Sequence, residues 1–278
     1  MRPMEVGVFL ASLGIKDAVE AIKKAREIGI EVVQLQGAVR RNYYDQGRTD
    51  EVRAALEDNS VLASAVCAGY AGESYRDIQA VKETVGLTNP ATLEERIEET
   101  KRFANFAAEL GIPILTTHIG VIPEDRNSED YRRLLGTIGL VSDYCRSKSV
   151  MFAMETGQEK ADLMVAFMRD LGNDNVKINF DPANMILYDS GDPIGALETL
   201  RDYVVHIHVK DGKRPTEAGK LGHETPLGEG EVGMERYVAK LKEIGYKGPL
   251  MIEREGGADR IGDIMRAKAL LEKLRDQV

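Results

Sequence analysis

Short runs of apolar residues, many of them β-branched, alternate along the chain with longer segments whose apolar positions recur at three- and four-residue intervals. The short runs are typical of buried parallel strands and the longer segments of amphipathic helices, so the alternation predicts repeated βα units. Eight strands are expected, at Glu5–Phe9, Val32–Gln36, Val61–Val66, Ile114–His118, Val150–Glu155, Val176–Asp181, Val204–Lys210 and Leu250–Glu253.

Glycine closes several of the predicted helices. The first helix, Ile15–Ile28, carries three alanines and Ile22 on one apolar stripe and is followed by Gly29. Glycine ends helices readily because it adopts a left-handed conformation that other residues avoid. The helices before the fourth, sixth and eighth strands end in the same way, at Gly111, Gly172 and Gly245. This regular punctuation favours an α/β fold, a single closed (β/α)8 TIM barrel, over a doubly wound open sheet.

The length of the chain fits this barrel. Its 278 residues are expected to form one domain, residues 1–278, because such barrels typically contain ~250 residues. The connections after the third and seventh strands, Gly69–Pro90 and Asp211–Val232, are longer than the others. Long loops in a compact domain usually cover a functional site, so these two segments are expected to border one.

The net charge of −9 disfavours nucleic-acid binding, which depends on clustered Lys and Arg. Small molecules or other protein chains are the expected partners, and the sequence leaves open whether the chain forms a homo-oligomer. Cys67 and Cys145 lack CxxC spacing and are expected to be structural thiols in a reducing compartment. The sequence shows neither a signal peptide nor 18 consecutive apolar residues, so no membrane association and a cytoplasmic location are expected.

Acidic and imidazole side chains gather at the predicted carboxyl ends of four strands, where β/α barrels build their active sites. The fifth strand ends in Glu155 and the sixth in Asp181. In the seventh strand the two-residue period puts His206 and His208 on one face, with His208 nearer the rim. Glu253 lies at the corresponding level of the eighth strand. Neighbouring strands thus offer Glu, Asp, His and Glu.

Three carboxylates and an imidazole at one barrel mouth would shift one another's pKa values strongly unless a cation neutralised them. Taken singly, Glu155 could equally pair with a buried Lys or Arg, and Asp181 in Asp-Pro-Ala-Asn would more often cap a helix. Their conjunction predicts one divalent metal ion held by Glu155, Asp181, His208 and Glu253. Oxygen-rich ligation with one nitrogen suits Mn²⁺, Mg²⁺, Co²⁺ or Zn²⁺ and does not select among them.

Six motifs accompany these residues. They are THIG at Thr117–Gly120, METG at Met154–Gly157, FDPAN at Phe180–Asn184, HIHVKD at His206–Asp211, PLGEGEV at Pro226–Val232 and IERE at Ile252–Glu255. With them the chain resembles, nearly end to end, the xylose isomerase-like family of barrel enzymes. Within it the chain is most similar to the sugar phosphate isomerase/epimerase group, which includes ketose 3-epimerases and inosose dehydratases.

The resemblance implies that Glu155, Asp181, His208 and Glu253 are the family's metal ligands. It also implies that Glu155 and Glu253 are catalytic and act as acid and base. In such epimerases one carboxylate removes the proton beside a carbonyl and the other returns a proton on the opposite face. The metal holds the carbonyl and the adjacent hydroxyl oxygen and stabilises the enediolate.

Five further residues are candidates for contact with a carbohydrate substrate: Gln34, His118, Asn184, His206 and Arg214. The resemblance places Arg214 where related epimerases carry a substrate-contacting Arg. Asn184 stands where they often carry a His, and Gln34 where the family commonly has Glu, so the resemblance leaves the substrate open. For His118 and His206 a hydrogen-bonded structural role is the alternative.

Two weaker signals lie near the same rim. Lys210 and Glu255 could meet a polar substrate, but an ion pair between them is the simpler expectation. The GEG sequence at Gly228–Gly230 could cradle an anion through its backbone N–H groups, although such glycines more often mark a turn.

The sequence therefore favours a metal-dependent isomerase or epimerase of a small keto sugar or sugar derivative. An inosose-type dehydratase on the same site is the close alternative, because both reactions begin by removing a proton beside a carbonyl. A nuclease like endonuclease IV is disfavoured by the presence of only four histidines and by the net charge of −9. A non-catalytic sugar-binding barrel is disfavoured because both candidate acid/base glutamates are present.

Overall fold

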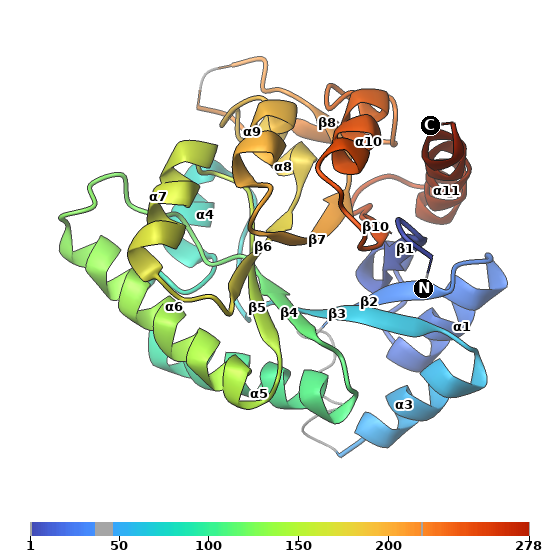
Figure 1. The fold of residues 1–278 in the computed structure, drawn as a ribbon, viewed down its shortest axis with the longest axis horizontal. Helices are drawn as coiled ribbons and strands as arrows, with labels where there is room; N and C mark the ends of the chain where they lie inside the picture. Colours follow the sequence, from blue (N-terminus) through green and yellow to red (C-terminus); the bar gives the residue numbers. More distant parts are fainter. Residues whose placement is uncertain (1, 37–46, 218, 278) are drawn as a thin grey trace.

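The computed structural model describes residues 2–36, 47–217 and 219–277, in which eight parallel strands close into a barrel (Figure 1). The closed order is β1-β10-β7-β6-β5-β4-β3-β2. The strands are β1 Val6–Phe9, β2 Val32–Gln36, β3 Leu62–Ala68, β4 Ile114–Thr117, β5 Met151–Glu155, β6 Val176–Phe180, β7 Val204–Val209 and β10 Leu250–Ile252. The predicted TIM barrel is confirmed, and every predicted strand is present with ends shifted by at most two residues.

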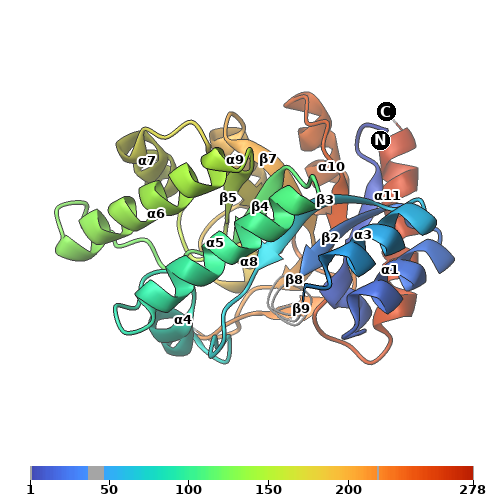
Figure 2. The same cartoon turned by 90° about the horizontal axis from the view of Figure 1, so that it is seen from below.

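Helices surround the barrel (Figures 1 and 2). They are α1 Ala18–Glu27, α3 Thr49–Asp58, α5 Leu93–Glu109, α6 Glu129–Ser147, α7 Ala161–Leu171, α9 Pro193–Leu200, α10 Met234–Glu243 and α11 Arg260–Asp276, with the 3-10 helix η1 Leu10–Leu13 after β1. In α1 the apolar stripe is buried as predicted. This helix begins later than expected because the Asp17 side chain caps it by accepting from the Glu20 N–H. Gly29 ends the segment with φ +75°.

Both long connections contain secondary structure of their own. The segment after β3 includes the short helix α4 Ile78–Thr84, and the segment after β7 folds back as an antiparallel pair, β8 Asp211–Lys213 with β9 His223–Thr225. Elements this short carry too few residues for a periodic pattern to reveal them. Figure 2 shows α4 and the β8–β9 hairpin at the same end of the barrel.

Two small clusters of buried apolar side chains stand apart from the main hydrophobic core. Phe9, Val32 and Met251 form one, and Ala65, Ile114 and Ala153 form the other. Gly7 packs against the first cluster, since a Cβ at that residue would lie 2.9 Å from Met251 Cε. Buried polar side chains gather toward the carboxyl ends of β5, β6, β7 and β10. A search of the described helices finds no segment long and apolar enough to cross a membrane.

Candidate metal centre

Glu155, Asp181, His208 and Glu253 meet at the carboxyl end of the barrel. Each offers a ligand atom, and these atoms all lie within 4.8 Å of one another. Glu155 is the last residue of β5, Asp181 directly follows β6, His208 lies in β7, and Glu253 directly follows β10. All four residues are buried. The structure thus brings together the four residues that the sequence selected.

His208 Nδ1 lies at the centre of this group. It is 3.3 Å from Glu155 Oε1, 3.3 Å from Glu253 Oε2 and 3.7 Å from Asp181 Oδ2. His208 Nδ1 and Asp181 Oδ2 are both buried without a hydrogen-bond partner among the described residues. Buried polar atoms left unpaired are costly, and a donor set of three carboxylates and one imidazole matches the ligands that divalent cations prefer. The residues present therefore fit a divalent metal ion.

The two carboxylate oxygens of Asp181 have different surroundings. Its Oδ1 accepts from the backbone N–H groups of Ala183 at 2.8 Å and Asn184 at 3.0 Å, which caps the short helix α8 Pro182–Leu187. Its Oδ2 faces His208 and has no hydrogen-bond partner in the described chain. The helix cap, an alternative at the sequence level, is confirmed at one oxygen and leaves the other free to bind a cation.

The pKa values of Glu155 and His208 are shifted in the directions that keep the carboxylate negative and the imidazole positive. Burial acts to raise the pKa of Glu155, but the charges of His118 and His208 hold it well below its usual range. Burial acts to lower the pKa of His208, but Glu253 and Glu155 hold it well above its usual range. In the same way the neighbouring Glu155 outweighs burial and raises the pKa of His118 to about 9. A positive charge beside these carboxylates is therefore electrostatically favourable.

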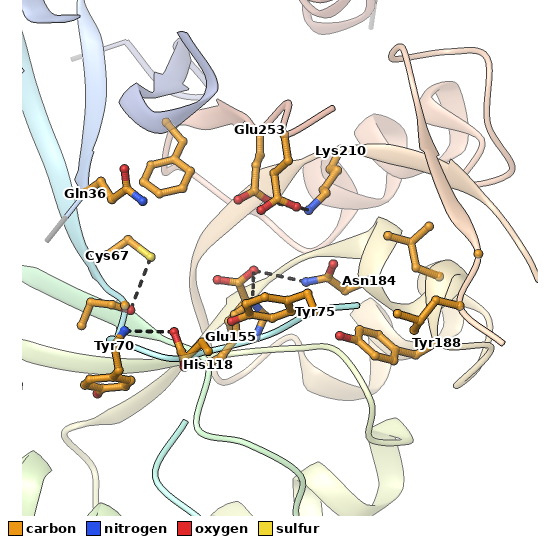
Figure 3. Close-up of a pocket in the computed structure, with 18 residues that line it drawn as sticks. Gln36, Cys67, Tyr70, Tyr75, His118, Glu155, Asn184, Tyr188, Lys210 and Glu253 are labelled. Carbon is orange, nitrogen blue, oxygen red and sulfur yellow. Dashed lines mark hydrogen bonds and ion pairs between the residues drawn. The ribbon is translucent and has the colours of Figure 1, made fainter. Parts of the chain in front are cut away.

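A cavity of about 390 Å³ opens above the cluster (Figure 3). His118 and Asn184 line it, as expected for substrate contacts. His118 Nε2 lies 3.3 Å from Glu155 Oε1, and Asn184 Nδ2 donates to the same oxygen at 3.2 Å. Both side chains therefore border the candidate site and touch one of its carboxylates.

Lys210 is another cationic residue among the described residues that line the cavity. Its Nζ donates to Glu255 Oε2 at 2.5 Å, which confirms the expected ion pair, and also to Glu253 Oε2 at 3.1 Å. Its side chain is only 4% exposed. These two carboxylates outweigh the effect of burial and raise the pKa of Lys210 well above its usual range. Lys210 is thus a fixed positive charge beside Glu253.

Gln34 and His206, also predicted to contact substrate, lie deeper in the barrel. Neither has exposed surface, and neither lines the cavity. Gln34 accepts from His208 Nε2 at 2.7 Å, and His206 Nδ1 donates to Asn179 Oδ1 at 2.9 Å. Because strand side chains on one face rise by two residues per level, His206 sits one level below His208. Direct substrate contact therefore stays a prediction at both positions, and the contacts observed there are with other side chains of the barrel.

Arg214 and the GEG turn lie outside the cavity. Arg214 directly follows β8, and its Nη1 donates to Asp189 Oδ1 at 2.6 Å. Its contact with substrate stays a prediction, since its observed partners include Asp189 and Gly191. In the GEG turn the backbone N–H groups of Gly228 and Gly230 donate to Asp211 Oδ2 at 2.9 and 3.1 Å. The chain's own carboxylate fills this cradle, which supports the turn interpretation.

Several residues of the cavity wall carried no clear signal in the sequence. The wall includes aromatic and aliphatic side chains at Phe9, Tyr75, Leu187, Tyr188 and Leu221. Phe9 ends β1 and stacks on the His208 ring, with 5.9 Å between ring centroids. Tyr75 belongs to the long connection after β3, which loop length alone marked as a cover. Strand ends and long loops were therefore the only available indications of this wall.

Comparison with known proteins places these features in context. The family profile described as "Xylose isomerase-like TIM barrel" matches residues 22–276. L-ribulose-5-phosphate 3-epimerase UlaE of Shigella flexneri is 23% identical over 279 residues, covering 96% of this chain and 93% of that protein.

Solved structures give the same fold. The xylose isomerase domain protein from Planctomyces limnophilus is 34% identical with a TM-score of 0.91, covering 100% of this chain and 98% of that one. The probable 3-DHS dehydratase AsbF from Bacillus anthracis, at 19% identity and a TM-score of 0.74, covers 99% of this chain and 100% of that one.

Proposed function

Because this chain belongs to the xylose isomerase-like TIM barrel family, we propose that it is a metal-dependent isomerase or epimerase of a small keto sugar or sugar derivative. The observation that carries the proposal is the convergence of Glu155, Asp181, His208 and Glu253 around a buried imidazole nitrogen without a partner in the described chain. The similarity to UlaE, an L-ribulose-5-phosphate 3-epimerase, supports this class of reaction.

A divalent ion held by these four residues would polarise a carbonyl and bring an adjacent hydroxyl into register with it. Glu155 and Glu253 then carry out the proton transfers. They extend from β5 and β10, which are separated in the barrel by β6 and β7, so their carboxylates approach a substrate from different sides. One glutamate removes the proton from the carbon beside the carbonyl, and the other returns a proton on the opposite face. No net proton is gained or lost.

The surroundings of each glutamate suit this exchange. His118 and Asn184 contact Glu155 Oε1, while Lys210 donates to Glu253 Oε2. These charge-assisted contacts orient both carboxylates. The apolar and aromatic wall of the cavity excludes water from the proton that is being moved. A volume of about 390 Å³ lies at the small end of ligand cavities, which suits a monosaccharide-sized substrate.

The test begins with the metal content of the purified protein. The protein is then incubated in D₂O with a panel of keto sugars, free and phosphorylated, and followed by ¹H NMR. We expect bound divalent metal and deuterium uptake at the carbon beside the carbonyl of at least one substrate. Exchange should vanish in Glu155→Gln and persist in Glu243→Gln, a control on the exposed side of α10.

Three outcomes separate the candidate functions. Deuterium uptake with an epimeric or isomeric product supports the proposal. Loss of water to an unsaturated product assigns the dehydratase alternative, the class of reaction named for the similar protein AsbF. Absence of both bound metal and exchange across the panel overturns the proposal.

A further inference from the structure

The two ring nitrogens of His208 face different surroundings. Nδ1 points into the carboxylate cluster, whereas Nε2 points down into the barrel and lies 2.7 Å from Gln34 Oε1. The ring is fully buried and stacks on Phe9 with an interplanar angle of 14°. A buried imidazole with one nitrogen turned to a metal site needs an acceptor for the hydrogen on the other nitrogen.

Gln34 is held so that its carbonyl oxygen faces His208. Its Nε2 donates to Thr116 Oγ1 on β4 at 2.9 Å, which directs Oε1 toward the histidine. Both polar atoms of the amide therefore have partners, although the side chain has no exposed surface. Such an arrangement presents one oriented acceptor to the ring nitrogen of His208 that faces away from the carboxylates.

Asn179 does not replace Gln34 in this role. Its Nδ2 lies 3.3 Å from His208 Nε2, but the same Nδ2 donates to Glu155 Oε2 at 3.2 Å. A carboxylate oxygen only accepts, so this atom of Asn179 is the N–H donor and cannot accept from His208. Gln34 Oε1, at 2.7 Å, is the acceptor that the surroundings of Nε2 provide.

We propose that Gln34 is a positioning residue of the metal centre: its carbonyl oxygen keeps the His208 hydrogen on Nε2, so that the lone pair of Nδ1 faces the metal. The inference rests on the proposed function, because it requires His208 to be a ligand. It gives Gln34 a purpose that substrate contact cannot, since the side chain does not reach the cavity. An outer partner of this kind commonly changes metal affinity by about 10–100-fold when it is removed.

In His206, the other histidine of β7, the ring hydrogen lies on Nδ1 and not on Nε2. His206 Nδ1 donates to Asn179 Oδ1 at 2.9 Å, and its Nε2 lies 3.1 Å from Ser64 Oγ. Two imidazoles whose centroids are 6.1 Å apart thus carry their hydrogens on different nitrogens. The chain contains only four histidines, so their ring nitrogens can be assigned individually by NMR.

The first experiment measures metal affinity by competition with a chelator, using Zn²⁺. In Gln34→Met, which keeps the length of the side chain and removes the acceptor, we expect affinity to fall by about 10–100-fold. Gln34→Glu restores an acceptor and should bind at least as tightly as the wild type. Gln36→Met is the matched control: Gln36 lies two residues further along β2, lines the cavity, and should leave metal affinity unchanged.

The second experiment needs no variant. Long-range ¹H–¹⁵N NMR of the Zn²⁺-loaded wild type should show His208 coordinated through Nδ1 with a protected hydrogen on Nε2, and His206 with its hydrogen on Nδ1. Coordination through Nε2 overturns the inference, as does wild-type affinity in a folded Gln34→Met protein. In both cases metal binding by the wild type leaves the proposed function standing. A wild type that binds no metal overturns the proposed function itself, and the inference with it.

Discussion

Two adjacent levels of the barrel interior contain similar polar residues but complete their hydrogen bonds differently. At the upper level Asp181 Oδ2 and His208 Nδ1 lack partners within the described chain. At the lower level the side chains of Gln34, Asn179 and His206 all have partners. The polar side chains of the lower level are paired with one another, whereas the upper level keeps two buried polar atoms that no described residue pairs.

Charge separates the two levels as well. The upper level holds three carboxylates beside the imidazole of His208. The lower level holds neutral amides, and burial together with the charge of His208 lowers the pKa of His206 to about 3, so this imidazole stays neutral. Neutral side chains with hydrogen-bond partners can orient the groups next to them without attracting a cation themselves. Each of the following predictions tests one side of this contrast.

The largest effect is expected at the upper level. Glu253→Gln keeps the shape of the side chain but removes a base, so the rate of deuterium exchange into substrate should fall by about 10²–10⁴-fold. The matched control is Glu255→Gln, because Glu255 also contacts Lys210 but is 65% exposed, and its loss should change the rate less than about tenfold. Equal losses of exchange rate in the two variants would contradict a role of the Glu253 carboxylate in proton transfer.

Glu159 is a buried carboxylic acid that does not belong to the four-residue cluster. It lies four residues after Glu155, and burial raises its pKa to about 7, although its Oε1 accepts from the Ile122 N–H at 3.0 Å. The folded protein therefore holds this proton more tightly than the unfolded chain. The associated stability is present below the unfolded pKa of 4.5 and is lost as pH rises through about 7.

Glu159→Gln stays neutral throughout and lacks this loss. Relative to the wild type, its free energy of unfolding should rise by at most about 3 kcal/mol between pH 4.5 and pH 8, as measured by urea denaturation. Parallel pH profiles for the two proteins would show that folding does not raise the pKa of Glu159, in contrast to this expectation.

Metal removal should distinguish the two levels directly. At a free metal concentration a hundredfold above Kd, binding should stabilise the fold by about 2.7 kcal/mol, and a chelator should remove that increment. Asp181→Asn at the upper level should lose most of the increment. Ser64→Ala at the lower level should lower the stability of metal-free and metal-loaded protein equally, because Ser64 contacts His206 and not the ligands. An increment unchanged by Asp181→Asn would remove Asp181 from the metal centre.

Much of the fold and the four-residue cluster were predictable from the sequence. Strand period and strand ends select inward-facing residues near the rim, and Glu155, Asp181, His208 and Glu253 all satisfy both conditions. Helix-closing glycines such as Gly29 mark where one βα unit gives way to the next. These are local properties, and a barrel repeats them without needing long-range information.

Depth within the barrel was not predictable in this way. The two-residue period shows that Gln34 and His206 face inward, but their level depends on the stagger between strands that are distant in sequence. For the same reason the contact between Gln34 and His208, separated by 174 positions, has no local signature. The surroundings of Arg214 were not predictable either, because it follows the first strand of the short β8–β9 hairpin, and three-residue strands leave no periodic pattern.

The smallest effect is expected within the lower level, and it tests whether that level acts as one unit. Asn179→Leu removes the acceptor of His206 Nδ1 and a donor to Glu155 Oε2, so the metal-free protein should lose about 1–3 kcal/mol of stability. If the bonds are interdependent, the same change should cost less in a His206→Leu background, where no ring N–H is left unsatisfied. A double-mutant cycle by urea denaturation should then give a coupling of about 0.5 kcal/mol or more. Additive losses would mean that the lower level is a set of separate contacts, and the difference between the two levels would then lie in charge alone.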